Sequence, residues 1–489
     1  MKKQVFIWGL AGILAAGMLS PARGGEKADN ADKPEAAAAA ESNADAEPYS
    51  ARVKIDENSL NSLNLDEFSN VYTLENSVDI ALRQNSRARM ADESVVQTKA
   101  RYDQKKTSKN VHVNFNNVTT LQNRNISNNE VVLDSLSDQL TASLQVLLTT
   151  FGRLEKEIAA AYLQIGVAAW EAVSVKRDIA YQAKKCFFAC LRANALAEAA
   201  EINRKYCQES LDDVNSLGGD SLLVTQAELL LEEANDQLQR SKAEIKLCNS
   251  EFSDVLEDRN INGLTDLHFV NPEEVRIDPL FDVEDLQELA LKRRSEILSI
   301  DRSLKVAEEL RESEKCSRNP ELSLSADYIY SPGHHATSSI NMYLLNLRIN
   351  WEAWDGGMRE KKLIELDSQI RALEACRDRA GSLVCTEAQK AWINFNAASE
   401  LAETAQKRLD LAWAYRQSVR EKFLGGQVDF NEVRESLRSL NEAHKDYVKA
   451  VYEKNTAFAG LEYSAGCDFP GRRLEITPEL LNTAPPEVP

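Results

Sequence analysis

The chain has 489 residues, and its 58 basic and 77 acidic side chains leave a formal net charge of −19. This negative excess repels a phosphate backbone, so no nucleic-acid partner is expected. Only 19 glycines and 12 prolines punctuate the chain, which predicts long uninterrupted elements.

The first 22 residues have the pattern of a cleaved secretory signal peptide. Lys2 and Lys3 precede an apolar stretch from Val5 to Leu19, and small residues follow. That stretch is shorter than the roughly 20 residues of a spanning helix, which disfavours the alternative of an uncleaved anchor. No other apolar run approaches this length, so no transmembrane helix is expected. Residues 23–70 are rich in Ala, Asp, Glu and Asn, and they predict a flexible N-terminal segment.

A helix is predicted to begin after Thr73, which is a candidate N-cap. Leu74, Val78, Ala81 and Leu82 form its apolar face. A related segment begins at Phe281, about 209 residues later.

Two further pairs of landmarks have nearly the same spacing. Gly219 and Gly426 are 207 residues apart, and Gly152 and Gly357 are 205 apart. We interpret this as an internal duplication. The expected domains are repeat 1 at 71–265, a linker at 266–280, repeat 2 at 281–466 and a tail at 467–489.

Each repeat contains two segments in which apolar and polar residues alternate, the pattern of a strand with one apolar face. These segments are Val111–Asn116, Leu136–Leu148, Leu322–Tyr330 and Tyr343–Trp351. About ten residues suffice for a tilted strand to cross a bilayer, and aromatic residues near the strand ends favour that interpretation. Two hairpins packed on a soluble core remain the alternative.

Long helical runs follow each pair of strands. Residues 153–216 have apolar or small residues at alternating steps of four and three, the seam of a coiled coil. Unbroken, this helix would be roughly 95 Å long. The matching seam of repeat 2 includes Arg416, and its return helix, from Phe430 to Leu461, includes His444. We interpret His444 as an irregularity of the seam and not as a ligand.

Two Gly-Gly breaks separate these runs, and they predict the turns of two helical hairpins. The first lies in Leu217–Leu230, L-G-G-D-S-L-L-V-T-Q-A-E-L-L, and the second in Phe423–Leu437, F-L-G-G-Q-V-D-F-N-E-V-R-E-S-L.

The eight cysteines show no metal-binding spacing. Cys186 and Cys207 fall on the seam of the first long helix, which favours packed thiols over a disulfide framework. His334 and His335 are expected in an exposed loop. No catalytic or cofactor-binding motif is present, so neither an enzyme nor a cofactor is expected.

The order of these segments resembles that of TolC-type outer-membrane efflux proteins over about residues 71–466. The segments T-L-E-N-S-V-D-I-A-L, N-P-E-L-S-L and W-D-G-G-M-R carry the resemblance. It implies a mostly α protein with a small β part, in which long coiled-coil hairpins accompany four transmembrane strands per protomer. A homotrimer would form a 12-stranded β-barrel and an α-helical barrel, in the Gram-negative outer membrane and spanning into the periplasm. Strand number agrees, because eight strands enclose only side chains whereas about twelve leave a channel.

The implied function is a passive exit duct for efflux or type I secretion. Its partners would be a periplasmic adaptor (membrane fusion protein), an inner-membrane transporter and outer-membrane lipid. The alternative is a periplasmic coiled-coil scaffold or adaptor without a pore.

The resemblance also implies roles for the two turns. Phe423 and Gly426 match the family's turn pattern, and Glu432 and Glu435 occupy its acidic positions, where a trimer would form a charged pore constriction. The alternative is two solvated charges stabilised by a helix dipole. The first turn lacks the first acid, because Thr225 stands there, although Glu228 fills the second position. The tip residues expected to dock the adaptor are Leu217, Gly218, Gly219, Phe423, Gly425 and Gly426.

Overall fold

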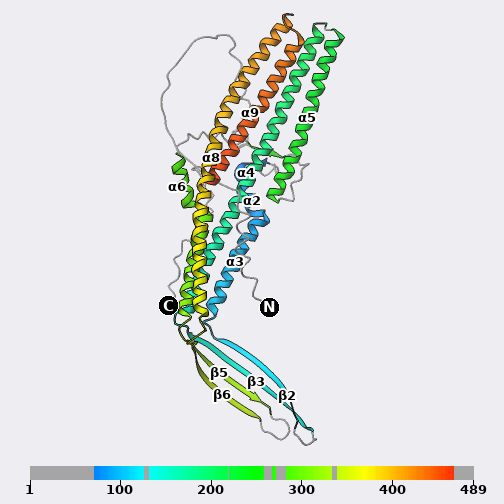
Figure 1. Cartoon of the computed structure of the whole chain (residues 1–489). Helices are drawn as coiled ribbons and strands as arrows, with labels where there is room; N and C mark the ends of the chain where they lie inside the picture. The colour runs from blue at the N-terminus through cyan, green and yellow to red at the C-terminus, as the bar shows by residue number, and fades with distance from the viewer. Residues whose placement is uncertain are drawn as a thin grey trace, which may run out of the picture. The chain divides into compact units, whose positions relative to one another are not determined.

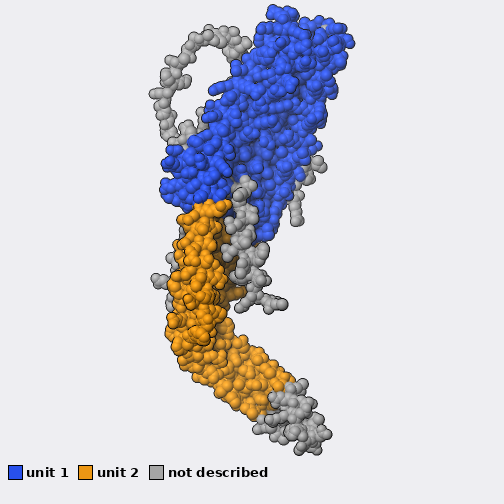
Figure 2. All heavy atoms as spheres, in the orientation of Figure 1, with its two compact units in different colours: residues 1–90, 173–295, 381–476 blue, residues 91–172, 296–380, 477–489 orange. Residues whose placement is uncertain are grey.

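A computed structural model describes residues 71–125, 131–218, 220–257, 267–270, 282–332 and 339–466. The predicted signal peptide, N-terminal segment and tail lie outside these residues, as do most of the linker, Gly219, His334, His335 and Cys467. The chain divides into two compact units (Figure 2). Unit 1 comprises residues 1–90, 173–295 and 381–476, and unit 2 comprises 91–172, 296–380 and 477–489.

One order of elements occurs twice among the described residues: two helices, two strands, a very long helix and a return helix (Figure 1). The first series is α2 (Leu74–Gln84), α3 (Ser86–Thr107), β2 (His112–Asn125), β3 (Val131–Thr149), α4 (Arg153–Ser216) and α5 (Ser221–Leu256). The second is α6 (Val283–Arg293), α7 (Ser295–Cys316), β5 (Glu321–Ser331), β6 (Ile340–Asn350), α8 (Met358–Leu424) and α9 (Phe430–Ser464). Two short strands, β1 (Val71–Tyr72) and β4 (His268–Phe269), pair in parallel.

The helix starts follow local capping chemistry. The Thr73 hydroxyl accepts a hydrogen bond from the Asn76 amide at 3.2 Å, so the predicted N-cap of α2 is confirmed. Asp282 caps α6 in a related way, through the Val283 amide. Each cap satisfies an amide that has no partner within its own helix.

The helix α4 has the predicted bounds, 153–216. It includes one stretch that is long and apolar enough, by length and composition, to cross a membrane, and 44% of that stretch is buried within the protein. A helix in a protein core can have the same length and composition, so this stretch alone does not overturn the expectation of no spanning helix.

In unit 1, the helices α4, α5, α8 and α9 lie side by side (Figure 1). One core cluster centres on Phe187, Phe252 and Phe269, whose rings pack edge to face at centroid distances of 5.2 and 5.5 Å. The burial departs from the predicted seam at this level. Gln182 is exposed and Cys186 is half-buried, whereas Ala183, Phe187 and Cys190 are buried.

In unit 2, the strands form one antiparallel sheet in the order β2-β3-β5-β6. Its register places apolar residues of all four strands in common rows. One such row is Phe115, Ala142, Tyr328 and Tyr343. Three positions further along the strands, a row is polar and consists of His112, Gln145, Ser325 and Asn346. Because alternate rows point to opposite faces, one face of the sheet is apolar and the other is polar.

Two strands are longer than the predicted ten or so residues: β2 has 14 residues and β3 has 19. Pairing between them extends to Asn125 and Val131, past the residues that alternate. The strand pair is therefore set by backbone hydrogen bonding beyond the point where the side-chain pattern ends.

The paired helical turns as candidate functional site

The two predicted hairpin turns are present in unit 1. After α4 the chain turns at Gly218, with φ of +67°, and after α8 it turns at Gly426, with φ of +69°. This left-handed conformation strongly favours glycine, which explains the Gly in each break. Asp220 and Asp429 then cap the return helices by accepting hydrogen bonds from Ser221 and Phe430 amides.

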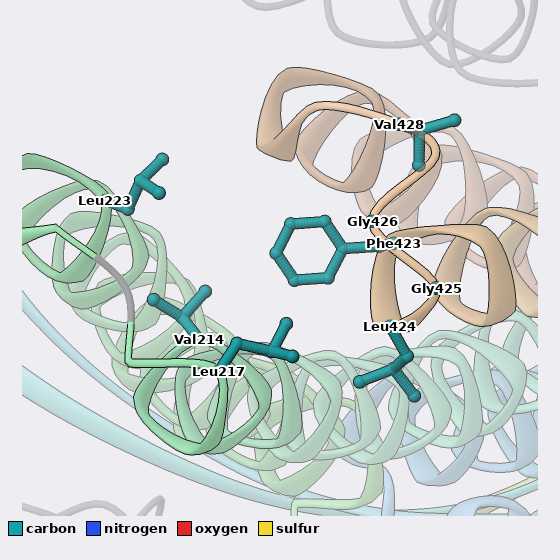
Figure 3. A pocket seen from close by; sticks show the side chains of 8 residues that line it. All are labelled: Val214, Leu217, Leu223, Phe423, Leu424, Gly425, Gly426 and Val428. Atoms are coloured by element: carbon teal, nitrogen blue, oxygen red, sulfur yellow. The ribbon is translucent and has the colours of Figure 1, made fainter.

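The two turns lie next to each other and enclose an open hollow of about 450 Å³. Figure 3 shows the Phe423 ring projecting from the second turn toward side chains of the first. Its lining residues are Val214, Leu217, Leu223, Phe423, Leu424, Gly425, Gly426 and Val428. The structure thus brings together four of the predicted tip residues, namely Leu217, Phe423, Gly425 and Gly426. Gly218 forms the neighbouring turn.

The hollow is apolar and partly open to solvent. Leu217 is 51% exposed and Leu424 is 44% exposed. Behind it, the rings of Phe423 and Phe430 pack at 5.9 Å, and Phe430 is fully buried. The turns therefore rest on a buried aromatic pair but leave apolar side chains exposed at their ends.

A charged network joins the hairpins just behind the turns. The Arg416 Nη2 donates to Glu209 Oε2 at 2.7 Å, and its guanidinium lies 3.9 Å from the centre of the Tyr206 ring. Arg420 donates to both carboxylate oxygens of Asp213, at 2.7 and 3.1 Å, and to Glu209 at 3.3 Å. The hydrogen bond with Asp213 raises the pKa of Arg420. We call Tyr206, Glu209, Asp213, Arg416 and Arg420 the inter-hairpin clamp.

Sequence reasoning missed the clamp, because it treated Arg416 only as a member of an apolar seam. A signal was nevertheless present. Arg416 and Glu209 are 207 residues apart, as are Arg420 and Asp213. This is the spacing of Gly219 and Gly426, so oppositely charged residues occupy matching positions of the two hairpins. Helices that run side by side in the same direction bring such positions together.

Glu432 and Glu435 are both exposed near the start of α9. Glu432 lies in the first helical turn, where the helix dipole favours a carboxylate. It accepts a hydrogen bond from the Tyr415 hydroxyl at 3.0 Å, and this bond raises the pKa of Tyr415. The structure brings the two carboxylates together on one helix, and it places Glu432 against α8.

His444 lies in the core behind the clamp and is 8% exposed. Burial lowers its pKa to about 4, so the imidazole is neutral at pH 7. Within the described ranges, no group of three or more His, Cys, Asp or Glu is arranged to hold a metal ion. The site therefore offers apolar contact and charge at exposed turns.

Comparison with known proteins gives no match to a family model, and no curated protein matches in sequence. Solved structures do match. CusC, described in terms of folding and transmembrane channel formation, aligns with a TM-score of 0.69 at 16% identity over 81% of this chain and 92% of its own. The outer-membrane channel OprN gives 0.66 at 17% identity over 80% and 89%. The outer membrane protein VceC from Vibrio cholerae gives 0.66 at 14% identity over 81% and 96%.

Proposed function

We propose that this chain, which has the fold of TolC-type outer-membrane efflux channels, is a passive exit duct in the Gram-negative outer membrane. The observation that carries the proposal is the single four-stranded sheet with one apolar face, joined by short turns to helices of 64 and 67 residues. Lipid accommodates the apolar face of such a sheet, and water its polar face.

Exposed side chains support the lipid contact. On β6 alone, Tyr343, Leu345, Leu347 and Ile349 are 62–81% exposed. In water such a patch would promote aggregation, whereas in a bilayer it faces hydrocarbon. The predicted signal peptide would direct export of the chain from the cytoplasm, which a location in the outer membrane requires.

The open edges of the sheet support a homotrimer. β2 and β6 are its edge strands, and each pairs on one side only within the described part of the chain. An unpaired edge in a membrane leaves backbone groups without partners, so a spanning sheet must close. Three protomers would supply twelve strands, enough for a water-filled barrel. The repeated order of elements further supports the proposed duplication of 71–265 as 281–466.

The paired turns suit the proposed partners. Their exposed apolar hollow would dock a periplasmic adaptor that links the duct to an inner-membrane transporter. In a trimer, Glu432 and Glu435 would form rings of carboxylate at the constriction of the helical barrel, and such rings favour cations. Passage of substrate would need no catalytic group, since the transporter supplies the energy.

Membrane fractionation followed by planar-bilayer recording tests the proposal. We expect crosslinkable trimers in the outer membrane and discrete conductance steps from purified protein. A soluble monomer that gives no channels would instead support the periplasmic scaffold.

A matched pair of variants tests which face of the sheet contacts lipid. Leu345→Arg places a charge on the apolar face, where it should reduce trimer recovery from the outer membrane. Asn346→Arg lies next to it on the polar face, beside Asp327, and should leave recovery unchanged. Equal recovery of both variants would contradict the assigned faces.

A further inference from the structure

Three cysteines gather on the first hairpin, away from the turns. Cys190 on α4 is 1% exposed and belongs to a buried core cluster, and Cys186 and Cys248 pack against that cluster. Cys190 and Cys248 are close enough for each thiol to shift the pKa of the other. The proposed channel function uses none of these groups.

The hairpin geometry accounts for this meeting. Cys190 lies 28 residues before Gly218, and Cys248 lies 28 residues after Asp220. In an antiparallel hairpin, residues equally distant from the turn stand opposite each other. At 1.5 Å per residue, both thiols are about 42 Å from the turn along their helices. The pair is therefore a fixed feature of the hairpin register.

We infer that Cys190 and Cys248 form a reversible disulfide that staples α4 to α5. Two thiols that meet across the antiparallel hairpin and pack against one cluster can form an S–S bond of about 2.05 Å. The described part of the chain holds no metal-binding group of three or more ligands, which favours thiol chemistry over metal binding at this cluster. An oxidising compartment would permit the bond.

The two sulfurs have different roles in the reaction. Cys248 is half-buried, and the neighbouring Cys190 thiol lowers its pKa. The Cys248 thiol, together with burial, raises the pKa of Cys190. Cys248 is therefore the thiolate that reacts first, because ionisation and access determine thiol reactivity.

The oxidant is a small or protein disulfide. The Cys248 thiolate attacks one of its sulfurs, forms a mixed disulfide and expels one thiolate. The Cys190 thiol then loses its proton and attacks the Cys248 sulfur, which displaces the second thiolate. Two cysteine thiols are oxidised, and one external disulfide is reduced to two thiols.

The staple is confined to the first hairpin. The positions 207 residues further on are Ala397 on α8 and Asn455 on α9, and α9 contains no cysteine. Oxidation would fix the register of α4 against α5, and no matching cysteine pair joins α8 to α9. This inference does not depend on the proposed channel function.

Peptide mapping of the purified full-length protein in detergent tests the staple. The protein is incubated with oxidised glutathione, blocked with N-ethylmaleimide and digested with trypsin without reduction. We expect peptide 186–192 linked to peptide 247–259, with fragmentation placing the bond at Cys190, and we expect dithiothreitol to release it. The inference would be overturned if the disulfide in the wild-type chain involved Cys186. It would also be overturned if Cys186, Cys190 and Cys248 all carried N-ethylmaleimide after the oxidation step.

Variants supply the controls. Cys186→Ala should retain the link and Cys248→Ala should lose it, while Cys207→Ala removes another buried thiol of α4 and should retain it. Oxidised wild-type protein should unfold about 5 °C or more above the reduced form. That difference should vanish in Cys248→Ala, and a persisting difference would count against the staple.

Discussion

Replacement of Arg416 by methionine tests whether the inter-hairpin clamp holds the two turns together. Methionine keeps an unbranched apolar side chain but removes the guanidinium, which is bound to Glu209 and stacked on Tyr206. The Arg416 side chain is 8% exposed, so water cannot readily replace these contacts.

The expected loss follows from the two contacts. A hydrogen bond between charged groups contributes about 1.5–3 kcal/mol to stability. Because Glu209 is 42% exposed, solvent screening brings this contribution toward the lower end of that range. The stacking on Tyr206 adds about 0.5–1 kcal/mol. We therefore expect Arg416→Met to lower the free energy of unfolding by about 2 kcal/mol, with about 1 kcal/mol of coupling to Glu209→Gln.

The assay is urea unfolding of the two single variants and the double variant, together with hydrogen exchange at the turns. Arg438 and Glu442 provide a control, because they too form an Arg–Glu ion pair, at 3.1 Å, but their side chains are 72% and 51% exposed. Their coupling should stay below about 0.5 kcal/mol. If both pairs show the same coupling, or if exchange near the turns is unchanged in Arg416→Met, the clamp does not hold the hairpins together.

Three further predictions concern the rest of unit 1. Glu432→Gln combined with Glu435→Gln should lower the cation preference or the divalent-ion block of the channel in planar bilayers, and unchanged selectivity would place both residues outside the constriction. Burial lowers the pKa of His444 to about 4, so between about pH 6.5 and 4 only the unfolded chain binds the proton and stability falls as the pH drops. This loss, at most about 3 kcal/mol, should be absent in His444→Phe when urea midpoints at pH 7 and 4.5 are compared, and an identical drop in that variant would refute the assignment. Gly466→Ala would place a Cβ 3.1 Å from the Arg293 backbone, at a φ of +68°, and should lower the melting temperature markedly. Gly426→Ala has a similar φ of +69° but meets no atom within 4 Å, so it carries only the conformational penalty of about 1–2 kcal/mol. Equal losses of stability in the two variants would contradict the close approach at Gly466.

The long helices could be predicted from sequence because their periodicity extends over many turns. The bounds of α4 match, and Thr73 forms the expected cap. The strand ends could not be predicted in this way. β3 begins at Val131, five residues before the predicted start, where consecutive apolar residues break the alternation but the backbone still pairs with β2. Backbone pairing with a partner strand does not require apolar and polar side chains to alternate, so the sequence pattern does not reveal where the pairing ends.

The cysteine cluster shows a second limit. A strict alternation of four and three steps places Cys186 on the seam, yet Cys190 is the buried thiol. A straight helix has 3.6 residues per turn, so its inward face drifts by about 20° per heptad from a 3.5-residue repeat. Over the 32 residues between Leu154 and Cys186, which is more than four heptads, this drift moves the buried stripe to the neighbouring residues. A heptad pattern thus predicts the helix better than it predicts the individual buried residues.

The candidate site was only half predictable, because the sequence marks the turns but not their neighbours. Gly218 and Gly426 follow from local backbone chemistry, whereas the clamp depends on two hairpins packing in matching register. That packing gives the hairpins different tasks. The first contributes the acids of the clamp, which join it to the second hairpin, and the paired thiols, which join its own two helices to each other. The second contributes the arginines and carries exposed Glu432 and Glu435 beyond them. If the proposed duct is gated, loss of the clamp would separate the two hairpins, and the staple would keep only α4 and α5 in register, so the hairpin that carries the paired carboxylates would be the freer of the two to rearrange.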